Sequence, residues 1–177
     1  MRIDPKYFNR FIGICAVITV VVIIYSTMRY FQRQITDFEN NVAGMQPDTL
    51  SFRSFSDQDS LFLGELPEAP LVIHFWSTWS DKSIEVGDFL WSYQQDENEL
   101  IVIAAAVRDG DEQVQNYVEN QPDTFHFVEG TKLFQRMMAP GLPTQIFIDH
   151  KKQVFDTHVG NDTTEIRTKL EQLLNSE

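Results

Sequence analysis

Two serines separated by two residues, Ser80 and Ser83, follow Trp79 in the segment FWSTWSDKS. Two cysteines at this spacing, at the start of a helix, would form a dithiol redox site. Hydroxyl groups cannot take over that chemistry, because disulfide exchange requires a thiolate and two hydroxyls form no reversible cross-link. The sequence therefore predicts no catalytic residue here, only two degenerate redox positions.

A serine nucleophile is the second chemistry to consider, because His74 and Asp81 lie close to the serines in the sequence. Hydrolases of the α/β type carry their serine in a Gly-x-Ser-x-Gly turn, and this chain has no such turn. Side chains alternate between the two faces of a strand, so His74 would point away from some of its supposed partners. A hydrolase is disfavoured.

Metal chemistry has little support. The four histidines, at 74, 126, 150 and 158, lack the spacing of metal ligands. The acid-rich stretches 56–60 and 108–113 lack the twelve-residue pattern of a calcium loop, so we interpret them as ordinary turns and caps. We predict no metal and no cofactor.

The elements that must position the serines are a buried strand and a helix. Residues 71–76 (LVIHFW) form a continuous apolar run, which is typical of a strand buried on both faces. A helix is predicted from about Asp81, with one apolar face made by Val86, Phe89, Leu90 and Tyr93. Serine is a strong N-cap residue, so the hydroxyl of Ser80 is expected to cap this helix.

Strands and helices alternate along the rest of the chain. Residues 50–55 and 61–66 are predicted to form a hairpin. Further strands are predicted at 100–107, 125–129, 144–149 and 153–159, and helices at about 111–120, 131–138 and 163–174. This order predicts an α/β fold with a mixed central sheet and helices on both faces.

The N-terminal part reads as a membrane anchor. Eighteen uncharged residues separate Arg10 from Arg29, enough for a helix to cross the hydrocarbon core of a bilayer. A cleaved signal peptide is disfavoured, since its apolar stretch is usually shorter and no small-x-small cleavage site follows. We predict a cytoplasmic N-terminus at 1–10, a transmembrane anchor at 11–31, a linker or a continuation of the helix at 32–49, and one domain at 50–177.

Charge and cysteine usage bound the partners and the location. Three basic residues precede the span and two follow it, which favours an inner-membrane protein with its domain outside the cytoplasm, in the periplasm of a two-membrane bacterium. Residues 34–177 carry nine basic and 25 acidic side chains, a net charge of −16 that disfavours nucleic-acid binding. The single cysteine, Cys15, lies in the span, so the domain cannot form a disulfide.

Three signals occur in order along the domain: LVIHFWSTWSDKS, then GLPTQIFID at 141–149, then QVFDTHVG ending at Gly160. Together they resemble the thioredoxin fold, and specifically the membrane-tethered TlpA-like redoxins, some of which serve cytochrome c maturation. The resemblance covers roughly residues 50–175 and includes the N-terminal hairpin.

The resemblance implies roles for particular residues. Ser80 and Ser83 stand where the family has the cysteines of its Cys-x-x-Cys motif, and Val86 stands where many relatives have a glutamate. It also implies a cis Leu142–Pro143 bond facing the turn at Trp79. In thioredoxin-like proteins the backbone beside this proline pairs with an extended client, which implies a peptide-binding groove at Trp79, Leu142, Pro143 and Thr144.

We therefore predict a membrane-anchored, extracytoplasmic thioredoxin-like domain without redox activity, acting as a protein-binding or assembly module. Two alternatives stay open. One is a thiol-disulfide oxidoreductase whose cysteines were replaced, and the other is a pseudo-oxidoreductase subunit that regulates an active relative.

Overall fold

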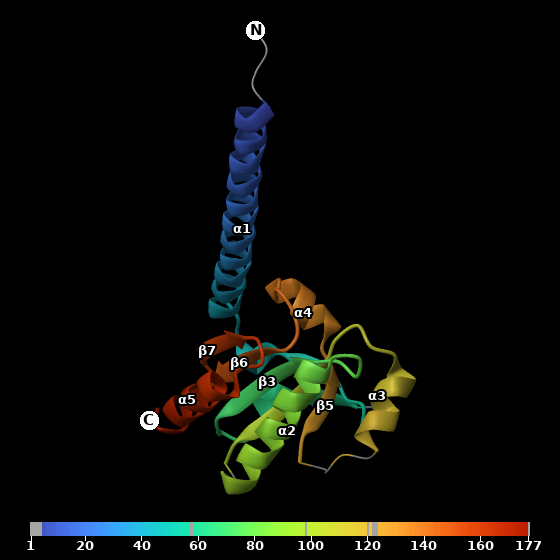
Figure 1. Cartoon of the computed structure of the whole chain (residues 1–177). Helices are drawn as coiled ribbons and strands as arrows, with labels where there is room; N and C mark the ends of the chain where they lie inside the picture. The colour runs from blue at the N-terminus through green and yellow to red at the C-terminus, as the bar shows by residue number, and fades with distance from the viewer. Residues whose placement is uncertain (1–4, 57–58, 98, 120, 122–123, 177) are drawn as a thin grey trace.

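The computed structural model describes residues 5–56, 59–97, 99–119, 121 and 124–176, which form a long helix and a mixed α/β domain (Figure 1). The helices are α1 (Pro5–Ala43), α2 (Asp81–Asp96), α3 (Asp111–Val118), α4 (Thr131–Met137) and α5 (Thr163–Leu174). The strands are β1 (Ser51–Arg53), β2 (Ser60–Phe62), β3 (Leu71–Trp76), β4 (Ile101–Ala106), β5 (His126–Glu129), β6 (Thr144–Ile148) and β7 (Val154–Val159). Short 3₁₀ turns occupy Pro47–Thr49 and Leu63–Glu65.

The central sheet has the order β5-β4-β3-β6-β7. Strands β3, β4 and β5 run parallel, while β6 and β7 run antiparallel to their neighbours. Every residue of β3 is buried, as its continuous apolar run predicted. The predicted mixed α/β architecture is confirmed, and the N-terminal hairpin exists as the shorter pair β1–β2.

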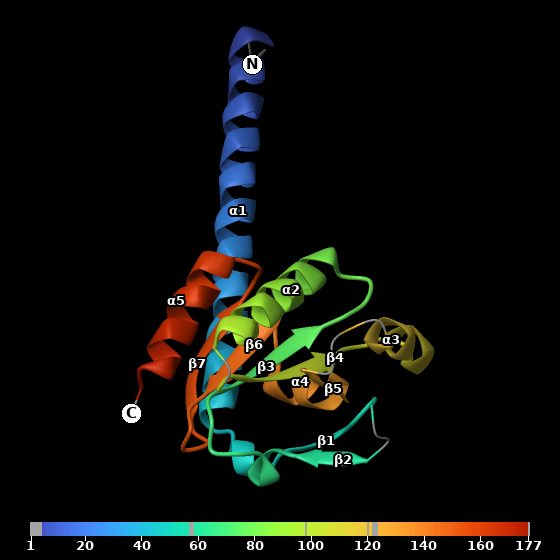
Figure 2. The same cartoon turned by 90° about the horizontal axis from the view of Figure 1, so that it is seen from below.

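Helices cover both faces of the sheet (Figure 2). On one face α2 and α5 bury an apolar cluster that includes Val72 of β3 and Phe147 of β6. On the other face α4 and the end of α1 bury a second cluster around Ile73, Phe75 and Phe134. These residues alternate along the strands, since successive side chains point to opposite faces.

Helix α1 does not end at the predicted span. It continues without a break to Ala43, so of the two interpretations of residues 32–49 the structure shows the continued helix. Phe38 and Val42 are fully buried in the same cluster as Ile73. The last turns of α1 are therefore part of the core of the domain.

The first part of α1 is different in character. Its apolar side chains from Phe8 to Phe31 are exposed in the isolated chain. Between Arg10 and Ala43 it is long and apolar enough to cross a membrane, the one such helix among the described residues. Exposed apolar surface on this scale is unfavourable in water and favourable in lipid.

Candidate functional site

Ser80 and Ser83 lie on either side of the first turn of α2. The Ser83 hydroxyl donates to the Ser80 hydroxyl over 2.7 Å, and Ser83 is completely buried. Ser80 occupies the N-cap position, but its side chain accepts no backbone N–H. The predicted capping role of its hydroxyl is therefore wrong, because that oxygen is engaged by Ser83 instead. Its carbonyl still accepts from Ser83 N and Ile84 N.

Beneath the serine pair, His74 of β3 joins the sheet to α2. Its Nε2 lies 3.0 Å from the carbonyl oxygen of Ser83, and its Nδ1 lies 3.3 Å from the amide nitrogen of Gln145. A carbonyl only accepts, so Nε2 carries the proton and Nδ1 accepts from Gln145. Burial lowers the pKa of His74 from 6.5 to about 4, although the bond to Ser83 opposes this shift. The imidazole is thus neutral at pH 7 and holds α2 in place.

The polar residues continue across the sheet as a buried row. Gln145 of β6 pairs in register with His74 on β3 and with His158 on β7. Within the described chain, Gln145 Oε1 and His158 Nε2 are buried without hydrogen-bond partners. Such atoms are uncommon, because an unpaired buried polar group loses its hydration without compensation. The row is the polar exception in an otherwise apolar layer.

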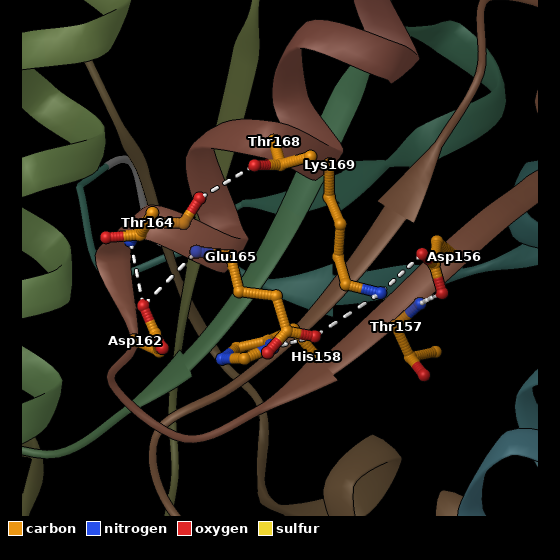
Figure 3. Close-up of polar contacts among 8 residues, drawn as sticks. All are labelled: Asp156, Thr157, His158, Asp162, Thr164, Glu165, Thr168 and Lys169. Carbon is orange, nitrogen blue, oxygen red and sulfur yellow. Dashed lines mark hydrogen bonds and ion pairs between the residues drawn. The ribbon is translucent and has the colours of Figure 1, made fainter.

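The outer end of the row meets α5 (Figure 3). His158 Nδ1 lies 3.3 Å from Glu165 Oε1, and Lys169 forms ion pairs with both Glu165 and Asp156. The carboxylate of Asp162 caps α5 by accepting from the backbone N–H of Glu165. These contacts attach β7 to α5 and account for the charged side chains structurally.

Asp109 fixes the loop that carries Trp79. Its Oδ2 accepts from the hydroxyl of Ser77 at 2.8 Å and from the backbone N–H of Thr78 at 2.6 Å. Its Oδ1 accepts from the hydroxyl of Thr78 at 3.0 Å and from the N–H of Gly110 at 3.1 Å. Sequence reasoning missed this residue, because an acidic turn carries no signal for a partner about thirty residues away.

The predicted binding residues meet at one edge of the sheet. Thr144 opens β6 and pairs with Phe75, one residue before β3 ends, so the loops that carry Trp79 and Pro143 lie at the same edge. The Leu142–Pro143 bond is cis. Trp79 is 65% exposed and Leu142 half-buried, whereas Pro143 and Thr144 are buried. Two of the four predicted residues are thus accessible.

The backbone beside Pro143 is held on one side and open on the other. Gly160, whose φ of 124° is unfavourable for any residue with a side chain, donates its N–H to the Pro143 carbonyl at 3.0 Å. Leu142, by contrast, makes no backbone hydrogen bond to any part of the chain that the structure describes. Its N–H and C=O are available to another chain.

The hollows of the domain lie away from this edge. An open hollow of about 700 Å³ lies between the end of α1 and β7, lined by residues such as Glu39 and Phe155. A closed cavity of about 20 Å³ lies under Ser83 beside the unpaired Nε1 of Trp76, room for about one water molecule. No cluster of three potential metal ligands occurs among the residues placed by the structure.

No family model and no curated protein matches this sequence. Solved structures do match. DsbF from MTB is 19% identical, with a TM-score of 0.63, over 73% of this chain and 98% of its own. A thiol:disulfide interchange protein of the thioredoxin family from Chlorobium tepidum is 17% identical, with a TM-score of 0.63, over 74% and 97%.

A third similar structure is a secreted disulfide oxidoreductase of Mycobacterium tuberculosis, described as homologous to E. coli DsbE. It is 15% identical, with a TM-score of 0.59, over 71% of this chain and 96% of its own. Identities this low speak for the fold alone. The chain has a thioredoxin-like fold, as the sequence resemblance predicted, and its structural neighbours are disulfide oxidoreductases of the DsbE type.

Proposed function

We propose that this protein is a membrane-anchored, extracytoplasmic thioredoxin-fold domain that has no thiol redox activity and binds a protein partner at the edge carrying Trp79 and Leu142. The observation that carries the binding role is the open backbone of Leu142 beside the exposed ring of Trp79. The neighbour described as secreted supports the location outside the cytoplasm.

The lack of redox activity follows from composition and from geometry. The only cysteine is Cys15, in the apolar part of α1. At the site, the two hydroxyls are bonded to each other, and His74 is committed to the carbonyl of Ser83. A hydroxyl pair cannot exchange electrons with a client disulfide.

The binding role follows from the chemistry of a strand edge. An extended segment can pair with a free N–H and C=O as an added strand does, and side chains beside it then select the sequence. Leu142 offers both backbone groups, and Trp79 offers a large ring with little conformational entropy to lose. We expect an extended segment with an apolar side chain directed at Trp79.

The redox part is tested with the full chain in detergent, in an insulin-reduction assay with dithiothreitol. We expect no turnover from the wild-type protein and measurable turnover from the Ser80→Cys/Ser83→Cys variant, which restores two thiols in the same fold. Turnover by the wild-type chain would refute this part of the proposal.

The binding part is tested by co-purification from native membranes. Trp79→Ala and Leu142→Arg should each deplete the same bound protein, whereas Phe155→Ala, which removes an exposed ring on β7, should leave it unchanged. If all three variants retain the wild-type set of bound proteins, the edge is not a binding surface.

A further inference from the structure

Helix α1 enters the core of the domain without a flexible joint. It runs as one helix from Pro5 to Ala43, and its last turns bury Phe38 and Val42 completely. Asn41 donates its side-chain N–H to the carbonyl of Met137, the last residue of α4, at 3.1 Å. The domain therefore has one orientation relative to the helix that we propose as its anchor.

The distance between the domain and the bilayer is short. The uncharged stretch of α1 ends at Arg29, and nine residues later Phe38 is already in the core. At about 1.5 Å per residue this is a rise of roughly 13 Å. The headgroup layer on each side of the hydrocarbon core takes up about 5–8 Å of that rise. Loops on the membrane side of the domain thus come close to the headgroups.

One end of the domain faces the membrane. In both Figure 1 and Figure 2, the start of α2 and the loop before it lie on the side toward which the N-terminal part of α1 extends. The register of Thr144 with Phe75 brings the loop 138–143 to the same edge. That loop begins directly after Met137, beside α1. The hairpin β1–β2 lies at the opposite end in Figure 2.

This edge carries the most exposed large apolar side chains that the structure describes after residue 31. They are Trp79 and Met138, which are 65% and 61% exposed. Tryptophan is favoured at the boundary between headgroups and acyl chains, where its ring is buried and its N–H stays hydrated. Methionine is flexible enough to follow a disordered surface.

We infer that the edge formed by residues 77–80 and 138–143 rests on the lipid headgroups, with Trp79 and Met138 entering the interface. The inference rests on the proposed anchoring by α1. The contact is apolar rather than ionic, because residues 34–177 carry a net charge of −16 and gain nothing from anionic lipids. A partner of Leu142 then meets the domain at the membrane surface.

The test uses the full chain with Cys15→Ser in phosphatidylcholine nanodiscs that contain spin-labelled lipid. A fluorophore is attached to one new cysteine at a time. Met138→Cys reports on the edge, and Phe62→Cys is the matched control, an exposed apolar residue on the hairpin. Val20→Cys reports on the apolar part of α1. Trp79→Cys replaces Met138→Cys if that variant does not fold.

We expect lipid quenching of the edge label to exceed that of the Phe62→Cys label by about threefold or more, and to be unaffected by 0.5 M salt, roughly the range in which screening removes ionic contacts. A flexible Gly-Ser insertion after Arg33 should reduce it. Equal quenching of the two labels, with strong quenching at Val20→Cys, overturns the inference while the anchor stands. Absence of quenching at Val20→Cys refutes the anchor, and the inference with it.

Discussion

The imidazole Nε2 of His74 lies 3.0 Å from the carbonyl oxygen of Ser83, and this contact joins the middle of β3 to the first turn of α2. The ring is fully buried and neutral, with a pKa of about 4. In a thioredoxin fold whose two site positions are serine, this histidine serves the position of the helix rather than a reaction.

We expect acid to destabilise the protein through His74. The folded-state pKa of about 4 lies below the ordinary 6.5, so between these values the unfolded chain binds more protons. Stability is therefore complete above pH 6.5 and falls as the pH drops toward 4, by up to about 3 kcal/mol. Urea unfolding of the full chain in detergent, followed by far-UV circular dichroism at several pH values, measures it.

The matched comparison is His74→Leu against His150→Gln. His74→Leu should flatten the pH dependence between 6.5 and 4, and the free energy of unfolding at pH 7 should fall by about 1–3 kcal/mol because the Ser83 carbonyl and the Gln145 amide lose their partner. His150→Gln should keep the wild-type profile. A His74→Leu variant with an unchanged slope would contradict the assignment.

We expect Asp109→Ala to loosen the loop before Trp79. The carboxylate accepts four hydrogen bonds, from Ser77, Thr78 and Gly110, so its loss should lower stability by about 2–4 kcal/mol. Hydrogen exchange at Thr78 should accelerate. Asp111→Ala, which removes an exposed ion pair with Arg53, is the control and should cost less than about 1 kcal/mol.

We expect the end of α1 to be needed for the fold of the domain. Phe38→Ala should destabilise the domain by about 3–5 kcal/mol, since it opens a cavity in a closed core. Phe31→Ala, on the exposed part of the same helix, should leave domain unfolding nearly unchanged. Unfolding in urea, followed by tryptophan fluorescence in detergent, compares the two variants. Equal effects would mean that α1 and the domain are independent.

We expect His158 to contribute little to stability despite its burial. Its Nε2 has no partner within the described chain, and its Nδ1 contacts only Glu165, whose side chain is largely exposed. His158→Leu should therefore change the free energy of unfolding by less than about 1 kcal/mol, because it removes one unpaired buried atom along with one weak contact. Chemical denaturation at pH 8 measures the change, and a loss as large as that of His74→Leu would refute it.

Local patterns predicted most of the elements. The apolar run of β3, the apolar stripe of α2 and the alternation of strands and helices all appear in the structure where the sequence places them. The capping hydroxyl of Ser80 is the clear error, because the preference of serine for an N-cap says nothing about a competing hydroxyl one turn later.

The contacts of the site could not be predicted in the same way. Asp109 reaches Thr78 across 31 positions, and Gln145 reaches His74 across 71. Contacts at such separations depend on strand register and on the order of strands in the sheet, which no local window contains. The cis bond before Pro143 was expected only from the resemblance to thioredoxin-like proteins.

The sequence by itself determined the element types, the apolar helix and the chemistry that this site lacks, because periodicity and covalent composition are local properties. With serine at 80 and 83 and its one cysteine in α1, the domain has no thiol to exchange. Only the tertiary structure decided that the serines bond each other, that Leu142 keeps an open backbone, and that α1 continues into the core. These features arise where distant segments pack together, and packing is settled by the whole fold at once.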